Sequence, residues 1–270
     1  MCGIIAYAGH RPAVPVILDG LKRLEYRGYD SAGVAFIQNK QLQVIRAEGK
    51  LESLEKKIFA GDPLHATSGL GHTRWATHGL PVEHNAHPHI DNAKRLALVH
   101  NGIIENFQDL KSELEQKGCR FDSDTDTEVL AHLVSRGLDQ ARSIPEAIRY
   151  ALERVEGSYA LALIALDGEE QIWAARHSSP LLLGAGTGEN FLASDIPAFL
   201  PYTREVVFLE DGELVQIDAN SWRVYDCKSL QPLDKEPVHI SWDVQDAQKG
   251  GYKHFMIKEI MDQPQVIRDC

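Results

Sequence analysis

Two Asp-Gly pairs, each flanked by apolar runs, constrain the fold of this chain more than any other feature. Asp-Gly is favoured in the tight primed turns of antiparallel hairpins, because these turns need positive φ angles. The pairs are Asp167-Gly168, between Tyr159–Leu166 and Gln171–Ala175, and Asp211-Gly212, between Phe208–Glu210 and Glu213–Ile217. The sequence therefore predicts strands that pair mainly antiparallel.

Helical patterns interleave with these strands and with further apolar runs. Additional strands are predicted at Cys2–Ala8, Gly33–Gln38 and Leu42–Ala47, and helices at Val16–Leu24 and Val129–Val134. Asn106 is predicted to cap another helix that ends at Gly118. Ser143 and Glu146 form a capping box for a helix that runs to Val155, with Gly157 as its stop. Helices interleaved with hairpins predict an α+β fold whose sheets need cover on two faces.

Composition excludes several classes of protein. The 270 residues are 43% hydrophobic and 25% charged, which is enough apolar content for a core and unlike disordered chains. The net charge of −11 argues against a nucleic-acid partner, because phosphate binding relies on clustered Lys and Arg. No apolar run approaches the roughly 20 residues that span a bilayer. The start of the chain lacks the pattern of a signal peptide.

The cysteines indicate a reducing compartment. They are widely scattered, with no C-x-x-C pair: Cys2, Cys119, Cys227 and Cys270. This spacing is typical neither of a disulfide framework nor of a zinc ribbon. We therefore expect a cytoplasmic protein that keeps its thiols reduced.

Cys2 directly follows Met1, and this position has chemical consequences. Methionine is normally removed before a small residue, so we expect a mature chain that begins with a cysteine and its free α-amine. A thiol titrates near ~8.5 and an α-amine near ~7.7–8.0, so the amine can accept the thiol proton at neutral pH. The alternative is that Cys2 is a small buried residue at the start of a strand.

Several motifs, in order along the whole chain, favour the nucleophile. They are Met1-Cys2-Gly3-Ile4, the block from Arg23 to Gly33, His72 to Gly79 (HTRWATHG), His100 to Asn106 (HNGIIEN), Ser123 to Val129 (SDTDTEV), Arg176 to Leu181 and Gly188 to Asp195. Together they resemble the N-terminal-nucleophile, or class II, glutamine amidotransferases. This resemblance implies a four-layer αββα sandwich and hydrolysis of glutamine to glutamate and ammonia, without a cofactor or metal.

The resemblance also implies a role for individual residues. Cys2 would attack the glutamine amide, and the Asn101 side chain and Gly102 N–H would stabilise the oxyanion. Arg74 would bind the α-carboxylate of glutamine, and Asp126 its α-ammonium. Taken alone, Asn101-Gly102 could be an ordinary turn, Asp126 a helix cap and Arg74 a partner in a surface salt bridge.

Four more positions are implied with less definite roles. Thr77 and His78 share the loop of Arg74 and would add hydroxyl or backbone donors to the substrate. Trp75 would cover bound glutamine and exclude water, or would simply pack. Arg27 lies in a matching block and would support the geometry of the nucleophile.

Among members of this family, the residues of these motifs most resemble those of enzymes that aminate a sugar phosphate. That likeness implies a glutaminase domain over residues 1–240 and, over residues 241–270, the start of a linker to a sugar-phosphate isomerase domain. Ammonia would then convert fructose 6-phosphate to glucosamine 6-phosphate. The full-length enzyme would be a homo-oligomer, and this chain alone would bind glutamine, without nucleic acid or membrane.

Three other interpretations remain open from the residues. The histidines of the stretch from His72 to His89 suggest a metal site, although they lack paired zinc spacings. A glutamine-sensing module without catalysis is a second alternative, which the presence of Cys2 and Asn101 disfavours. A third is an amidotransferase with a different acceptor, such as an amidophosphoribosyltransferase.

Overall fold

The computed structural model describes most of the chain, and the regular elements within the described part of residues 2–241 form two sheets and five α-helices. The described residues are 2–140, 142–168 and 171–241, with the isolated positions 257, 260, 261, 263, 267 and 268. The helices are α1 (Ala13–Leu24), α2 (Leu51–Ala60), α3 (Phe107–Gln116), α4 (Glu128–Asp139) and α5 (Ile144–Leu152), with short 3-10 turns η1 (Glu25–Arg27), η2 (Glu83–Asn85), η3 (Leu166–Gly168) and η4 (Ile196–Ala198). None of the helices in this part of the chain has the length and apolarity needed to cross a membrane.

Every ladder between the named strands is antiparallel, as the sequence predicts. The first sheet has the order β15 (Val238–His239), β11 (Glu205–Phe208), β9 (Leu182–Ala185), β10 (Glu189–Ala193), β1 (Gly3–Gly9), β4 (Ser68–Arg74), β2 (Ser31–Gln38) and β3 (Gln41–Glu48). The second has the order β14 (Pro232–Leu233), β13 (Trp222–Asp226), β12 (Glu213–Ile217), β8 (Ile172–His177), β7 (Gly157–Ala165), β6 (Leu96–Ile104) and β5 (His89–Ile90).

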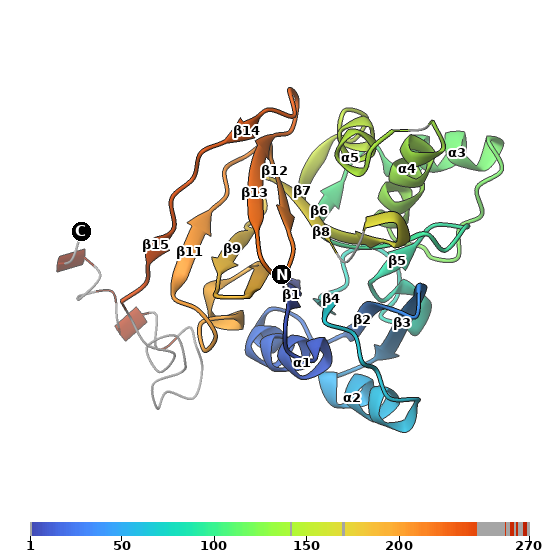
Figure 1. Cartoon of the computed structure of the whole chain (residues 1–270). Coiled ribbons are helices and arrows are strands. Elements are labelled where there is room, and N and C mark those ends of the chain that lie inside the picture. Colours follow the sequence, from blue (N-terminus) through green and yellow to red (C-terminus); the bar gives the residue numbers. More distant parts are fainter. Residues whose placement is uncertain are drawn as a thin grey trace.

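The buried side chains arrange these elements in four layers. Along β1, Ile5 and Tyr7 face the cluster that packs under α1 and α2, whereas Ile4 and Ala6 face the cluster between the two sheets. Strand β7 alternates in the same way between the inter-sheet core and a third cluster under α3, α4 and α5. Because side chains alternate across a strand, both sheets are covered on both faces. The helices lie on the outer faces of the sandwich (Figure 1), which confirms the predicted αββα fold.

One prediction from turn chemistry was confirmed and one was wrong. The hairpin predicted around Asp167-Gly168 is present, because β7 and β8 pair antiparallel, and both residues lie in η3 between these strands. Asp211-Gly212 does not close a hairpin at all, because β11 belongs to the first sheet and β12 to the second. Gly212 still turns the chain with a φ of 82°. This turn carries the chain from one sheet to the other.

Two helix ends also differ from the prediction. Asn106 stands at the N-cap of α3 but makes no capping bond; its side chain instead binds the backbone of Arg154 and Glu156. The capping box of Ser143 and Glu146 is present, but α5 ends at Leu152 and Gly157 begins β7.

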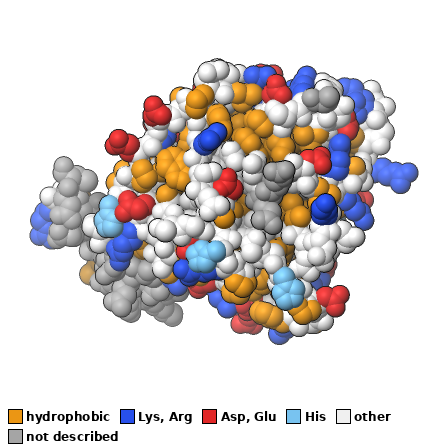
Figure 2. Space-filling model, viewed as in Figure 1, with side chains coloured by type: hydrophobic (Ala, Val, Ile, Leu, Met, Phe, Trp, Pro, Cys, Tyr) orange, Lys and Arg blue, Asp and Glu red, His pale blue; other side chains and the backbone are white. Residues whose placement is uncertain are grey.

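Acidic and basic side chains are interspersed on the face shown in Figure 2. The predicted linker from residue 241 lies almost entirely outside the described residues.

Candidate active site

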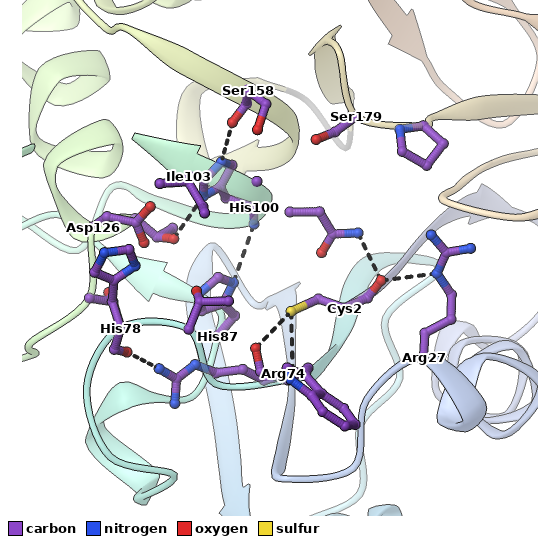
Figure 3. Close-up of a pocket in the computed structure, with 17 residues that line it drawn as sticks. Cys2, Arg27, Arg74, His78, His87, His100, Ile103, Asp126, Ser158 and Ser179 are labelled. Carbon is purple, nitrogen blue, oxygen red and sulfur yellow. Dashed lines mark hydrogen bonds between the residues drawn. The ribbon is translucent and has the colours of Figure 1, made fainter. Parts of the chain in front are cut away.

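A cavity of about 390 Å³ opens at the end of the sandwich where β1 begins and β4 and β6 end. The structure brings all nine sequence-predicted site residues to its wall: Cys2, Arg27, Arg74, Trp75, Thr77, His78, Asn101, Gly102 and Asp126. The sulfur of Cys2 points into the space between Arg74 and the elements that carry His100 and Asp126 (Figure 3). One site therefore collects residues that are up to 124 positions apart in the chain.

Strand register explains how these residues meet. In the first sheet Gly3 of β1 lies opposite Thr73 of β4, so Cys2 lies beside the end of β4, where Arg74 and Trp75 follow. The other sheet contributes Asn101 and Gly102, near the end of β6. Cys2 directly precedes β1, a central strand that pairs with β10 on one side and β4 on the other.

The Cys2 thiol is held by backbone groups and lies in a partly buried position. Its sulfur accepts a hydrogen bond from the Trp75 N–H at 3.2 Å and lies 3.5 Å from the Trp75 carbonyl oxygen. Burial raises the pKa of the thiol, and the Trp75 N–H and the Arg74 charge offset only part of that rise. The sulfur is therefore protonated at neutral pH, and nucleophilic attack requires a base.

The carbonyl of Cys2 anchors the residue from two sides. It accepts hydrogen bonds from Arg27 Nε and from Asn101 Nδ2, both at 3.1 Å. Arg27 is nearly buried and forms an ion pair with Asp195 at 3.1 Å, and Tyr26 donates to the same carboxylate. Arg27 therefore contacts the backbone of Cys2 and also lines the cavity.

Asn101 and Gly102 lie within strand β6, which excludes the ordinary turn as their explanation. Gly102 has a φ of 135°, a backbone conformation that side-chain-bearing residues rarely adopt. A Cβ atom at this position would stand 2.1 Å from the carbonyl oxygen of Ser158 in β7. Only glycine fits there, and its backbone remains accessible at the wall of the cavity.

Arg74 and Asp126 place opposite charges on the same cavity. Arg74 is buried, and its guanidinium donates to the carbonyls of Leu80, at 3.1 Å, and His78, so a surface salt bridge does not explain it. Asp126 does not cap α4; its Oδ2 accepts the Ile104 N–H at 2.8 Å. A buried cation and a buried anion on one wall suit a zwitterionic ligand.

The loop after Arg74 forms the outer rim of the cavity. Trp75 is 45% exposed and packs edge-on against Tyr29, with 5.6 Å between ring centroids, so it is only partly a packing residue. Asp30 accepts the Ala76 N–H at 2.8 Å and ties the start of the loop to the sheet. The His78 ring packs against Phe107 of α3. Thr77 lines the cavity between these two anchors.

Sequence reasoning missed eight residues that also line the cavity. They are His87, His100, Ile103, Thr125, Thr127, Ser158, Ser179 and Pro180. Most of them lie inside or next to the recognised motifs, so proximity to those motifs was an available signal. Ser158 had no such signal, because strand pairing alone brings β7 beside Gly102.

Four histidines of this region form a buried cluster: His72, His87, His89 and His100. Across the described positions, no group of three or more His, Cys, Asp or Glu is arranged to hold a metal ion. Burial lowers the pKa of His72 and of His89 to about 3, and it also lowers those of His87 and His100. These imidazoles are therefore neutral at physiological pH.

Two antiparallel sheets between helices, with a cysteine just ahead of a central strand and an Asn-Gly pair beside it, are the features of a class II glutamine amidotransferase domain. The sequence matches the glutamine amidotransferase domain family over residues 72–201. A solved glutamine phosphoribosylpyrophosphate amidotransferase from B. subtilis has the same fold, with a TM-score of 0.71 and 26% identity over 84% of this chain and 49% of its own. Over those residues, just under half of its length, the chain is similar to this family of domains.

Curated relatives are more similar in sequence to the chain than that solved structure is. The glutamine–fructose-6-phosphate aminotransferases (isomerizing) of Thermus thermophilus and Pyrococcus horikoshii are 49% and 50% identical to the chain over its whole length. The chain covers 44% and 45% of those proteins, so it spans less than half of the relatives it matches.

Proposed function

We propose that this domain hydrolyses glutamine to glutamate and ammonia through a γ-glutamyl thioester on Cys2. The observation that carries the proposal is the position of the Cys2 sulfur in one cavity with an Asn-Gly pair and a buried Arg–Asp pair. Arg74 would bind the α-carboxylate of glutamine and Asp126 its α-ammonium. The side-chain amide of the substrate would then reach the sulfur.

The chemistry follows from the surroundings of the thiol. No described side chain is a base in hydrogen-bonding contact with the sulfur, whose partners are both backbone atoms of Trp75. Once Met1 is removed, the α-amine of Cys2 would take the thiol proton and pass it to the departing ammonia. Water, activated by the same amine, then cleaves the thioester and regenerates the thiol.

The developing oxyanion would be stabilised by Asn101 Nδ2 and the Gly102 N–H. Such donors act where charge appears in the transition state, so they lower the barrier more than they strengthen substrate binding. The loop of Trp75, Thr77 and His78 would cover the substrate and exclude water. The role of Arg27 in this scheme is to hold the Cys2 carbonyl while the sulfur reacts.

The wider activity rests on the relatives. We infer that the ammonia serves a sugar-phosphate isomerase domain of a longer protein, which converts fructose 6-phosphate to glucosamine 6-phosphate. Identity of 49–50% to the aminotransferases, against 26% to the phosphoribosylpyrophosphate enzyme, favours this acceptor. We infer that the amidotransferase part spans residues 1–240, and the hydrogen bond from the Ile240 N–H to the Arg204 carbonyl supports a boundary near residue 240. The full-length enzyme would work in the cytosol as a homo-oligomer.

Glutamate release from glutamine tests the proposal. The chain should release glutamate after removal of Met1, as checked by intact mass, and C2A should release none. C119A is the matched control, since Cys119 is a second free, partly buried thiol away from the cavity, and it should retain full activity. Glutamate release by C2A, or by molecules that keep Met1, would refute the mechanism. No release by the processed wild-type chain would favour a glutamine-sensing module.

A further inference from the structure

The side chain of Asn101 has two ends of similar shape and opposite function. Its NH₂ group is a donor that can stabilise an oxyanion, whereas its carbonyl oxygen would repel one. In the structure Nδ2 donates to the Cys2 carbonyl at 3.1 Å, and Oδ1 lies 3.0 Å from Nε2 of His72. Some group must therefore distinguish the two ends of this amide.

His72 is placed to make that distinction. Its Nε2 stands within hydrogen-bonding distance of two oxygen atoms, Asn101 Oδ1 at 3.0 Å and the His100 carbonyl at 3.2 Å. An unprotonated nitrogen would direct its lone pair at both oxygens, so Nε2 must carry the proton. A reversed Asn101 amide would then direct an N–H group at the N–H of the imidazole.

The imidazole itself is held in a single orientation. His72 lies in β4, is fully buried and stacks on the His87 ring, with 4.1 Å between centroids. His87 is in turn held by the backbone N–H of His100, which lies 3.3 Å from its Nδ1. Nδ1 of His72 has no hydrogen-bond partner in the described structure, which suits an unprotonated nitrogen better than a donor. Burial, which lowers the pKa of His72 to about 3, keeps the ring neutral.

We propose that His72 is a positioning residue for glutamine hydrolysis, whose Nε2–H holds the Asn101 amide with its NH₂ group toward the oxyanion. This inference rests on the proposed function. His72 would not touch the substrate and would act only through Asn101. The Cys2 carbonyl favours the same amide orientation but is shared with Arg27, whereas His72 is the side chain that binds Oδ1.

Three variants in the full-length protein test the proposal. H72L removes the donor, and we expect kcat for glutamate release to fall at least about tenfold. The fall should be smaller than the 10²–10³-fold loss that follows removal of a whole oxyanion donor. KM for glutamine should stay within about twofold, because Arg74 and Asp126 are untouched. H72Q can place an amide N–H where Nε2 stands and should restore most of kcat. H72N is too short to do so and should resemble H72L.

A double-mutant cycle separates positioning from packing. In an N101A background, H72L should cause no further loss of kcat, because the group through which His72 acts is already absent. Additive losses, or kcat of H72L and H72N within twofold of wild type, would overturn the proposal. If H72L does not fold, as judged by circular dichroism, the comparison of H72Q with H72N decides. An inactive wild-type protein would instead refute the proposed function itself.

Discussion

Replacing Gly102 with alanine tests whether the chain depends on the close approach of β6 and β7. Adopting the φ of 135° costs a side-chain-bearing residue about 1–3 kcal/mol. The new methyl group would also stand 2.1 Å from the Ser158 carbonyl oxygen, which belongs to a paired strand and cannot rotate away. Overpacking of this kind adds about 1–3 kcal/mol. We therefore expect G102A to lose about 2–6 kcal/mol of unfolding free energy.

Gly118 offers a matched control for this variant. It ends α3 with a φ of 89°, but a Cβ there would meet nothing within 4 Å. G118A should therefore show only the backbone term of about 1–3 kcal/mol and keep its full kcat. Urea denaturation measures the unfolding free energy of G102A and of G118A, and the comparison requires that the two variants have equal m-values. In G102A, displacement of the oxyanion N–H should lower kcat by about 10²–10³. A loss of stability no greater than that of G118A, together with unchanged kcat, would refute the reasoning.

Three further outcomes are expected. R74K should raise KM for glutamine about 10- to 100-fold, since lysine lacks the planar fork that donates to several acceptors, and an unchanged KM would remove Arg74 from the carboxylate site. D126N keeps the acceptor for Ile104 N–H but loses the charge, so KM should rise similarly while the melting temperature shifts little. Unfolding free energy should fall as the pH drops from 6.5 to 5. In the unfolded chain His72 and His89 take up protons over this range, whereas in the folded chain they stay buried and neutral, because their pKa is about 3. The loss of unfolding free energy at pH 5 is about 2 kcal/mol for each histidine. A flat urea-denaturation profile over that range would contradict the burial of these rings.

Local chemistry predicted individual elements well where neighbouring residues decide the outcome. The capping box of Ser143 and Glu146 and the positive φ of Gly118 both follow from interactions within a few residues. Asn106 shows where such reasoning ends. It stands at a helix N-cap, yet its side chain bonds to residues about 50 positions away, because tertiary packing brings those groups within reach.

The candidate site shows the same division. All nine residues that the motifs identified meet at the cavity, but they were identified only through resemblance to a family, and eight other lining residues were missed. The cause of their meeting is the register between β1 and β4 and the stacking of the two sheets, which places Asn101 beside Cys2. His72 could not be recognised as a partner of Asn101, because nothing in its sequence position predicts which ring nitrogen faces which oxygen.

Local patterning in the sequence was enough to predict the types of element, because propensity, alternation and turn chemistry act over short distances. Tertiary structure alone decided which sheet each strand joined. Asp211-Gly212 has the composition of a hairpin turn, yet the chain there passes between sheets, since β12 finds its partners in β8 and β13. The tertiary structure also decided the direction in which the Asn101 amide points. Both outcomes depend on partners that are distant in sequence and meet only after the two sheets have packed together.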